Sequence, residues 1–149
     1  MGVNGLPESA ARTVLLEEIE KRTGLKLNGG GIALVLNPTE PQINAEGYSL
    51  EVSPEAIRIA ARTERGLLYG VAALIRNLDW APGKLSVSSP ISIKTSPASP
   101  IRGHQLGYRA AANSWDAWTV AQYDQYIREL VLFGVNAIEN IPFQDERVA

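Results

Sequence analysis

The chain has 149 residues and a mass of 16.1 kDa, enough for one domain, or for a small domain and part of another. With 45% hydrophobic and 20% charged residues it can bury a core, which excludes wholesale disorder. Its net charge of −2 without a basic run argues against nucleic-acid binding, and the absence of cysteine together with a single histidine, His104, excludes disulfides, Cys-ligated metals and two-His metal sites.

The first predicted element is a helix over 7–23, with Pro7 in its first turn and Gly24 directly after its end. One stripe of apolar side chains at helical spacing marks its buried face: Ala11, Val14, Leu15 and Ile19. The acidic side chains fall on the other face. We expect them to be exposed there and paired with the basic residues four positions on, Glu17 with Lys21 and Glu18 with Arg22.

A sheet and a second helix follow. The apolar run 32–36 predicts a buried strand, and the alternation over 48–52 predicts a strand that forms a hairpin with 56–60. Thr63 is typical of an N-cap for a helix over 64–78, whose many apolar residues indicate burial. Gly66 and Gly70 lie one turn apart on this helix, and we predict that they mark its closest approach to the sheet.

Two short strand patterns, Leu85/Val87 and Ile91/Ile93, close this part, and the proline-rich 97–100 is a linker. Beyond the linker, the pattern predicts a strand over 101–109, a helix over 119–133 with Thr119 and Gln122 as a capping box, and a strand over 136–141. We expect an inward stripe on the helix: Val120, Tyr123, Ile127, Leu130 and Val131. Strand–helix–strand is the βαβ unit of a parallel sheet. The domains are therefore 1–96 and 101–149.

The candidate ligand-binding residues lie in the second part, and none of them forms a convincing catalytic carboxylate pair. His104, Tyr108 and Arg109 can hydrogen-bond sugar hydroxyls, although ion pairing for Arg109 and a structural role for His104 are alternatives. Trp115 can stack on a sugar ring or pack at the helix start. Glu139 stands in an otherwise apolar strand, where it is a substrate contact, an ion-pair partner or simply exposed.

Three motifs resemble the accessory domain of family 20 glycoside hydrolases, the β-N-acetylhexosaminidase class, a domain also seen before α-glucuronidase barrels. They are 47–52 (GYSLEV), 57–59 (IRI) and 65–71 (RGLLYGV). The sequence 100–103 (PIRG) resembles the start of the first strand of the catalytic (β/α)8 barrel. In that strand, members carry an Asp and a sugar-binding Arg; here 107–109 lacks the Asp, and Arg109 comes one position early.

The resemblance implies an α+β fold: a zincin-like accessory domain, a small sheet with two helices, followed by an incomplete βαβ start of the barrel. It also implies that the chain is the N-terminal part of a carbohydrate-active, hexosaminidase-like hydrolase. The family's catalytic Asp–Glu pair belongs to the fourth barrel strand, so we expect this chain by itself to be inactive. A stand-alone carbohydrate-binding or protein-interaction module is the alternative.

The expected partners follow from this reading. A carbohydrate substrate would bind through the parent enzyme, without metal or cofactor and without nucleic acid or membrane. Exposed strand faces would be covered by the missing remainder of the barrel or by a second copy of the chain. The first residues lack the charged and apolar regions of a signal peptide, and the localisation stays open; the parent is compatible with a secreted or periplasmic protein.

Overall fold

A computed structural model of the chain describes residues 2–4, 9–28, 31–87, 90–106 and 118–140. They belong to two compact units, Met1–Ala98 and Ser99–Ala149. The first is an α+β unit with two helices, and the second has one helix between two strands. Among the described ranges, no helix combines the length and apolar character needed to cross a bilayer.

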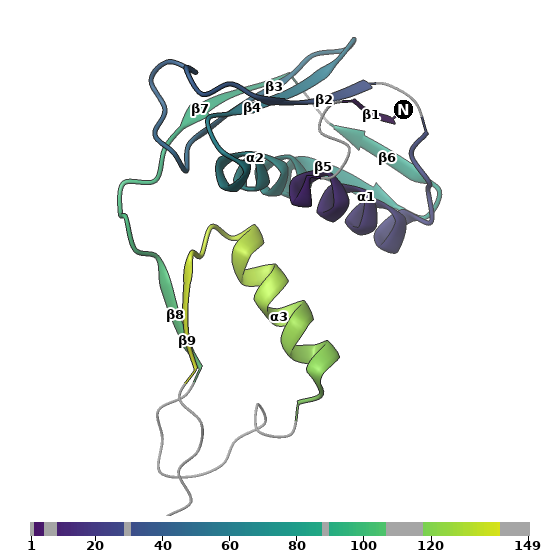
Figure 1. The fold of residues 1–149 in the computed structure, drawn as a ribbon. Coiled ribbons are helices and arrows are strands. Elements are labelled where there is room, and N and C mark those ends of the chain that lie inside the picture. The colour runs from purple at the N-terminus through teal and green to yellow at the C-terminus, as the bar shows by residue number, and fades with distance from the viewer. Residues whose placement is uncertain (1, 5–8, 29–30, 88–89, 107–117, 141–149) are drawn as a thin grey trace, which may run out of the picture. The chain divides into compact units, whose positions relative to one another are not determined.

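The first unit is built on a five-stranded mixed sheet (Figure 1). Its strands, in spatial order, are β1 (Gly2–Asn4), β2 (Gly31–Leu36), β4 (Ile57–Ala61), β3 (Tyr48–Val52) and β7 (Ile91–Thr95). The first three are parallel to one another, and β3 is antiparallel to both of its neighbours. The hairpin predicted between 48–52 and 56–60 is therefore confirmed, with its second strand one residue later.

Helices α1 (Ala10–Thr23) and α2 (Glu64–Asn77) lie on one face of this sheet (Figure 1). The apolar residues of the strands stand in register toward them, as in the row Leu34, Ile59, Leu50 and Ile93. Helix α2 is buried along most of its length. On the opposite face Glu51 lies between Arg58 and Ser92 and accepts a hydrogen bond from the Ser92 hydroxyl at 2.9 Å. The sheet thus has one apolar face covered by helices and one polar face.

Helix α1 starts later than its sequence pattern predicts. Ser9 is its N-cap, with the hydroxyl accepting from the Arg12 amide, so the first helical residue is Ala10. Residues 5–8, which include Pro7, lie outside the described part of the chain. The predicted end is confirmed, because Gly24 adopts a left-handed φ of 75° and its N–H bonds the Glu20 carbonyl.

The expected exposure of Glu18 is wrong. Its side chain is 2% exposed and holds Arg22 through Nε and Nη2 at 3.0 and 2.9 Å. The physical reason is a two-stranded hairpin, β5 (Leu78–Ala81) and β6 (Lys84–Val87), beside α1. Arg22 lies 5.0 Å from the ring centroid of Trp80 in this hairpin. Strand β5 starts where the sequence pattern still predicts helix, and neither β5 nor β1 was predicted.

The predicted close approach of α2 to the sheet is confirmed. A Cβ placed on Gly66 would collide with the backbone oxygen of Gly47, and one placed on Gly70 would collide with Cγ2 of Ile59. The Tyr48 side chain would lie at 3.2 Å from the Cβ at position 70. Only glycine at these two positions lets the helix lie this close to β3 and β4.

The second unit is a strand–helix–strand segment: β8 (Gly103–Leu106), α3 (Val120–Leu132) and β9 (Ala137–Asn140). The two strands are parallel, as predicted. The capping box of Thr119 and Gln122 is confirmed, and Gly134 follows the helix with a left-handed φ of 87°. Strand β8 begins at Gly103, two residues after the predicted start, and the predicted part 107–109 lies outside the described residues.

The inward stripe predicted for α3 is partly wrong. Val120 is 78% exposed and Ile127 is 39% exposed, whereas Tyr123, Leu130 and Val131 are partly buried. Among the described residues, β8 and β9 contribute four residues each, and these leave Val120 and Ile127 uncovered. Of the residues described in this unit, Leu132 is the one buried apolar side chain.

Candidate functional site

The two strands of the second unit present different side chains on their two faces. In the parallel register, Gly103, His104 and Gln105 lie beside Ala137, Ile138 and Glu139 in turn. His104 and Ile138 are partly buried, whereas the residues before and after them on both strands are exposed. Because side chains alternate along a strand, one face carries His104 and Ile138, and the other carries Gln105 and Glu139.

The first face is the one that packs on helix α3. Nε2 of His104 and the hydroxyl of Tyr126 are 2.7 Å apart, and the two rings meet edge to face at a centroid distance of 5.6 Å. Trp118 packs in the same edge-to-face manner on Tyr123 and Tyr126, at 5.5 and 5.1 Å. The imidazole thus points to the helix, where it ties β8 to α3.

The second face is open and polar. Gln105 and Glu139 are register neighbours, both exposed, and each is the third residue of its four-residue strand. Next to them are Gly103 and Ala137, and among the described residues a Cβ added to Gly103 would meet atoms of Ala137 at 3.8 and 3.9 Å. A carboxylate and an amide therefore stand side by side near the carboxyl ends of two parallel strands.

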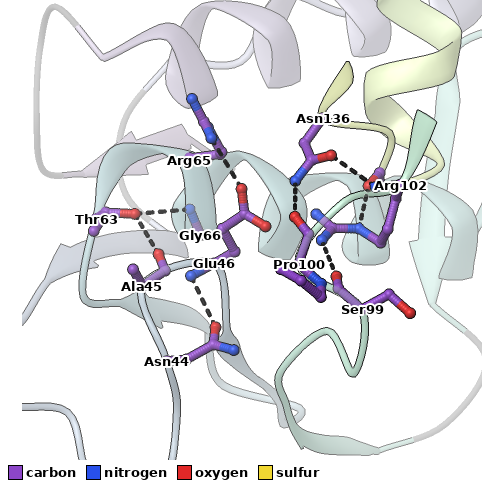
Figure 2. A network of polar contacts seen from close by, with 11 residues as sticks. Asn44, Ala45, Glu46, Thr63, Arg65, Gly66, Ser99, Pro100, Arg102 and Asn136 are labelled. Atoms are coloured by element: carbon purple, nitrogen blue, oxygen red, sulfur yellow. Dashed lines mark hydrogen bonds and ion pairs between the residues drawn. The ribbon is translucent and has the colours of Figure 1, made fainter. Parts of the chain in front are cut away.

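The opposite ends of β8 and β9 are fixed by a hydrogen-bonded clamp of Arg102 and Asn136 (Figure 2). The Arg102 guanidinium donates to the carbonyls of Gly134 at 2.6 Å and Ser99 at 2.8 Å. Asn136 accepts from the Arg102 amide at 2.9 Å and donates to the Pro100 carbonyl at 2.8 Å. The clamp fixes the register that places Gln105 beside Glu139.

A second network, in the first unit, holds the N-terminus of α2 to the segment before β3 (Figure 2). The Thr63 hydroxyl accepts from the Gly66 amide at 3.2 Å and donates to the Ala45 carbonyl. Arg65 forms an ion pair with Glu46 at 2.9 Å. The hydrogen bond and the charge of Glu46 raise the pKa of the Arg65 guanidinium above its ordinary value. This network holds the start of α2 against the segment 45–47, where Gly66 makes its close contact with the Gly47 oxygen.

The structure places only some of the residues proposed from the sequence. His104 and Glu139 are described, on opposite faces of the β8–β9 pair. Tyr108, Arg109 and Trp115 lie outside the described residues. Sequence reasoning missed Gln105 and Tyr126. The alternation within a four-residue strand was the one signal for Gln105, and it requires the register with β9 to become informative.

Metal binding has no candidate in the described ranges, where no three His, Asp or Glu side chains gather as a metal site would require. The sequence contains no cysteine.

The first unit, a mixed sheet on which helix α2 packs closely through Gly66 and Gly70, is the part of the chain that identifies its protein family. The chain belongs to glycosyl hydrolase family 20, because the model of domain 2 of that family matches residues 4–94. No curated protein matches the chain by sequence.

Solved structures of this family are similar to the chain. The exo-β-N-acetylglucosaminidase of Vibrio harveyi, solved in complex with N-acetylglucosamine, is 27% identical to the chain with a TM-score of 0.78. The match covers 97% of this chain and 22% of that enzyme. The N-acetyl-β-hexosaminidase of Streptomyces plicatus is 23% identical to the chain with a TM-score of 0.69, and the match covers 93% of this chain and 30% of that enzyme. The β-N-acetylhexosaminidase of Streptomyces coelicolor A3(2) is 24% identical to the chain with a TM-score of 0.68, and the match covers 93% of this chain and 29% of that enzyme. The chain thus spans less than a third of the length of these relatives.

Proposed function

We propose that the chain forms the N-terminal part of a β-N-acetylhexosaminidase-like glycoside hydrolase: a zincin-like accessory domain followed by the first βαβ segment of the catalytic (β/α)8 barrel. The observation that carries this proposal is the match of family domain 2 to residues 4–94, together with a structural match to the Vibrio harveyi enzyme over 97% of the chain. The parallel pairing of β8 and β9 around α3 supports the barrel segment.

The chain by itself is a non-catalytic part of that enzyme. Glycoside hydrolysis generally uses two carboxyl groups flanking the scissile bond, and family 20 uses a substrate-assisted variant of this chemistry, for which the resemblance implies an Asp–Glu pair on the fourth barrel strand. On the open face of β8 and β9, the register neighbour of Glu139 is the amide Gln105 rather than a second carboxylate. The substrate would be a carbohydrate held by the parent enzyme, with Tyr108, Arg109 and Trp115 as further candidate contacts.

Complementation tests this proposal. The part of the Vibrio harveyi enzyme that the chain does not match is co-expressed with the chain, and release of nitrophenol from nitrophenyl N-acetyl-β-glucosaminide is measured. We expect activity with both pieces and none with either piece alone. Turnover by the repurified chain alone would overturn its non-catalytic nature. A folded, co-purifying pair without activity would overturn its assignment as the hexosaminidase segment.

A matched variant shows whether any rescue depends on the fold described above. Gly66→Leu places a large side chain against the Gly47 carbonyl and should abolish complementation. Lys84→Ala, at an exposed position of β6, should leave it unchanged.

A further inference from the structure

The open face of β8 and β9 has the polar character of a ligand site rather than of a packing surface. Parallel strands that are covered on both sides carry near-continuous apolar residues. Here the covered face carries Ile138 and a histidine, His104, that is bonded to Tyr126 of α3, whereas the open face carries Gln105 and Glu139 beside the small residues Gly103 and Ala137. In the described part of the chain, neither polar side chain has a hydrogen-bond or ionic partner.

The position of the pair agrees with this reading. In parallel α/β folds, ligands bind at the carboxyl ends of the strands. Gln105 and Glu139 lie near that end of their strands, and the His104–Tyr126 contact shows that α3 covers the other face. Neighbouring strands are about 4.8 Å apart, so one small molecule can reach both side chains.

The chemistry of the two groups defines the ligand class. A carboxylate only accepts hydrogen bonds, whereas a primary amide both donates and accepts. Two adjacent hydroxyls of a sugar match this pair: one hydroxyl donates to Glu139, and the other donates to or accepts from Gln105. A metal ion would require further ligands, and no three-residue acidic or histidine cluster occurs among the described residues.

We infer that Gln105 and Glu139 form a sugar-binding pair that recognises two adjacent hydroxyls of the substrate. Glu139 supplies most of the binding, because hydrogen bonds to a charged group are stronger than those between neutral groups. This inference rests on the proposed function and deepens it, since it assigns the contacts that distinguish one sugar from another.

The test is an NMR titration of the ¹⁵N-labelled full chain with N-acetylglucosamine, followed through the backbone amides of 103–105 and 137–139 and the side-chain amide of Gln105. We expect saturable shifts at these positions. Glu139→Gln keeps the shape and removes the charge, and it should weaken the apparent Kd about tenfold. A sugar that lacks one of two adjacent hydroxyls, 4-deoxy-N-acetylglucosamine, should be weakened to a similar degree.

Helix α3 offers a matched control. Glu129 accepts a hydrogen bond from Gln125 at 2.8 Å, so this exposed pair also combines a carboxylate with an amide, away from the open face. Glu129→Gln should leave the Kd unchanged. The spectrum of each variant reports whether it is folded, and Gln105→Met, expected to weaken binding too, serves if Glu139→Gln does not fold.

Three results would overturn the inference: no saturable shift at these residues up to the solubility limit of the sugar, equal affinities for Glu139→Gln and Glu129→Gln, or shifts centred on His104 and Tyr126. Complementation uses the unmodified chain and separates the two proposals. Complementation without sugar-dependent shifts contradicts the sugar-binding pair alone, whereas site-specific shifts without complementation contradict the proposed enzyme.

Discussion

At the scale of single residues, two glycines determine how closely helix α2 approaches the sheet. Gly66 faces a backbone oxygen, that of Gly47, which cannot move without displacing the segment that leads into β3. Gly70 faces the Cγ2 methyl of Ile59, a fully buried side chain. Glycine costs a helix about 0.8–1.0 kcal/mol relative to alanine. Close packing therefore has to offset this cost at both positions.

Gly70→Ala tests which effect dominates. Helix propensity alone predicts stabilisation, but the added methyl group collides with Ile59. Overpacking of a core costs about 1–3 kcal/mol, so we expect a net loss of about 1–2 kcal/mol in the free energy of unfolding. Gly66→Ala should cost more, because its neighbour is backbone. Urea denaturation measures both, and a higher midpoint with an unchanged slope would refute close packing.

Tyr48, which lies beside Gly70, makes the free energy of unfolding depend on pH. Burial raises the pKa of its hydroxyl above the ordinary value of 10.0, partly opposed by the positive charge of Arg76. The unfolded chain then loses this proton at a lower pH than the folded chain does. Tyr48 thus contributes stability that is present below pH 10.0 and is lost as the pH rises toward its folded-state pKa. Tyr48→Phe should make unfolding less pH-dependent above pH 10.0, and an unchanged alkaline slope would contradict this.

At the scale of elements, the helix ends that carry a local capping signal were predicted, whereas the start of α1 and the end of α2 were not. Thr63 and Thr119 cap α2 and α3 through bonds to residues three positions away, and Gly24 and Gly134 follow α1 and α3 with left-handed backbones. Such interactions are contained within one turn of the chain. The sequence alone is therefore sufficient to find them.

Burial that depends on a distant element was not predictable in this way. Glu18 reads as a solvent-facing residue by helical periodicity, but the β5–β6 hairpin covers that side of α1. The Gly83 amide bonds the Thr23 carbonyl at 2.8 Å and Trp80 lies against Arg22. Strand β5 begins directly after α2, with no glycine or proline between them, so the local sequence did not predict the change from helix to strand.

This cluster predicts a coupling between Glu18 and Arg22. Arg22→Met removes the charged partner of a buried carboxylate, which costs about 3–5 kcal/mol in fully buried pairs. We expect a smaller loss here, because Arg22 is 40% exposed. The double variant Glu18→Met/Arg22→Met removes the buried charge as well and should be more stable than Arg22→Met alone. Chemical denaturation of the four proteins measures the coupling, and additive effects would show that the pair is not energetically linked.

The candidate site shows the same division at the scale of the whole molecule. The residue types of the second unit pointed to sugar chemistry, and Glu139 was selected from its apolar strand. The neighbour that completes the pair, Gln105, is 34 positions away, and only the parallel register brings the two together. The sequence also did not predict which face of the strand pair carries His104, because this depends on how α3 packs on the strands.

The two units also differ in how much of their apolar surface is covered. In the first unit, both helices and the sheet contribute fully buried side chains, such as Leu15, Leu50 and Leu74. In the described part of the second unit, only Leu132 is a buried apolar residue, while Ile101, Val120 and Phe133 are each at least 75% exposed. Because burial supplies most of the stability of a fold, we expect the two units to open independently.

Hydrogen exchange of the full chain measures this difference. The amides of α2 should exchange through unfolding of the first unit, whereas those of α3 should exchange through local opening, with protection factors at least about tenfold lower. Leu74→Ala, which leaves a cavity under α2, should lower protection in α1 and α2 and leave α3 unchanged. Equal protection in α2 and α3 at every protein concentration would show that the second unit is stabilised by contacts beyond its own core. Protection of α3 that rises with concentration would instead indicate that a second copy covers Val120 and Phe133.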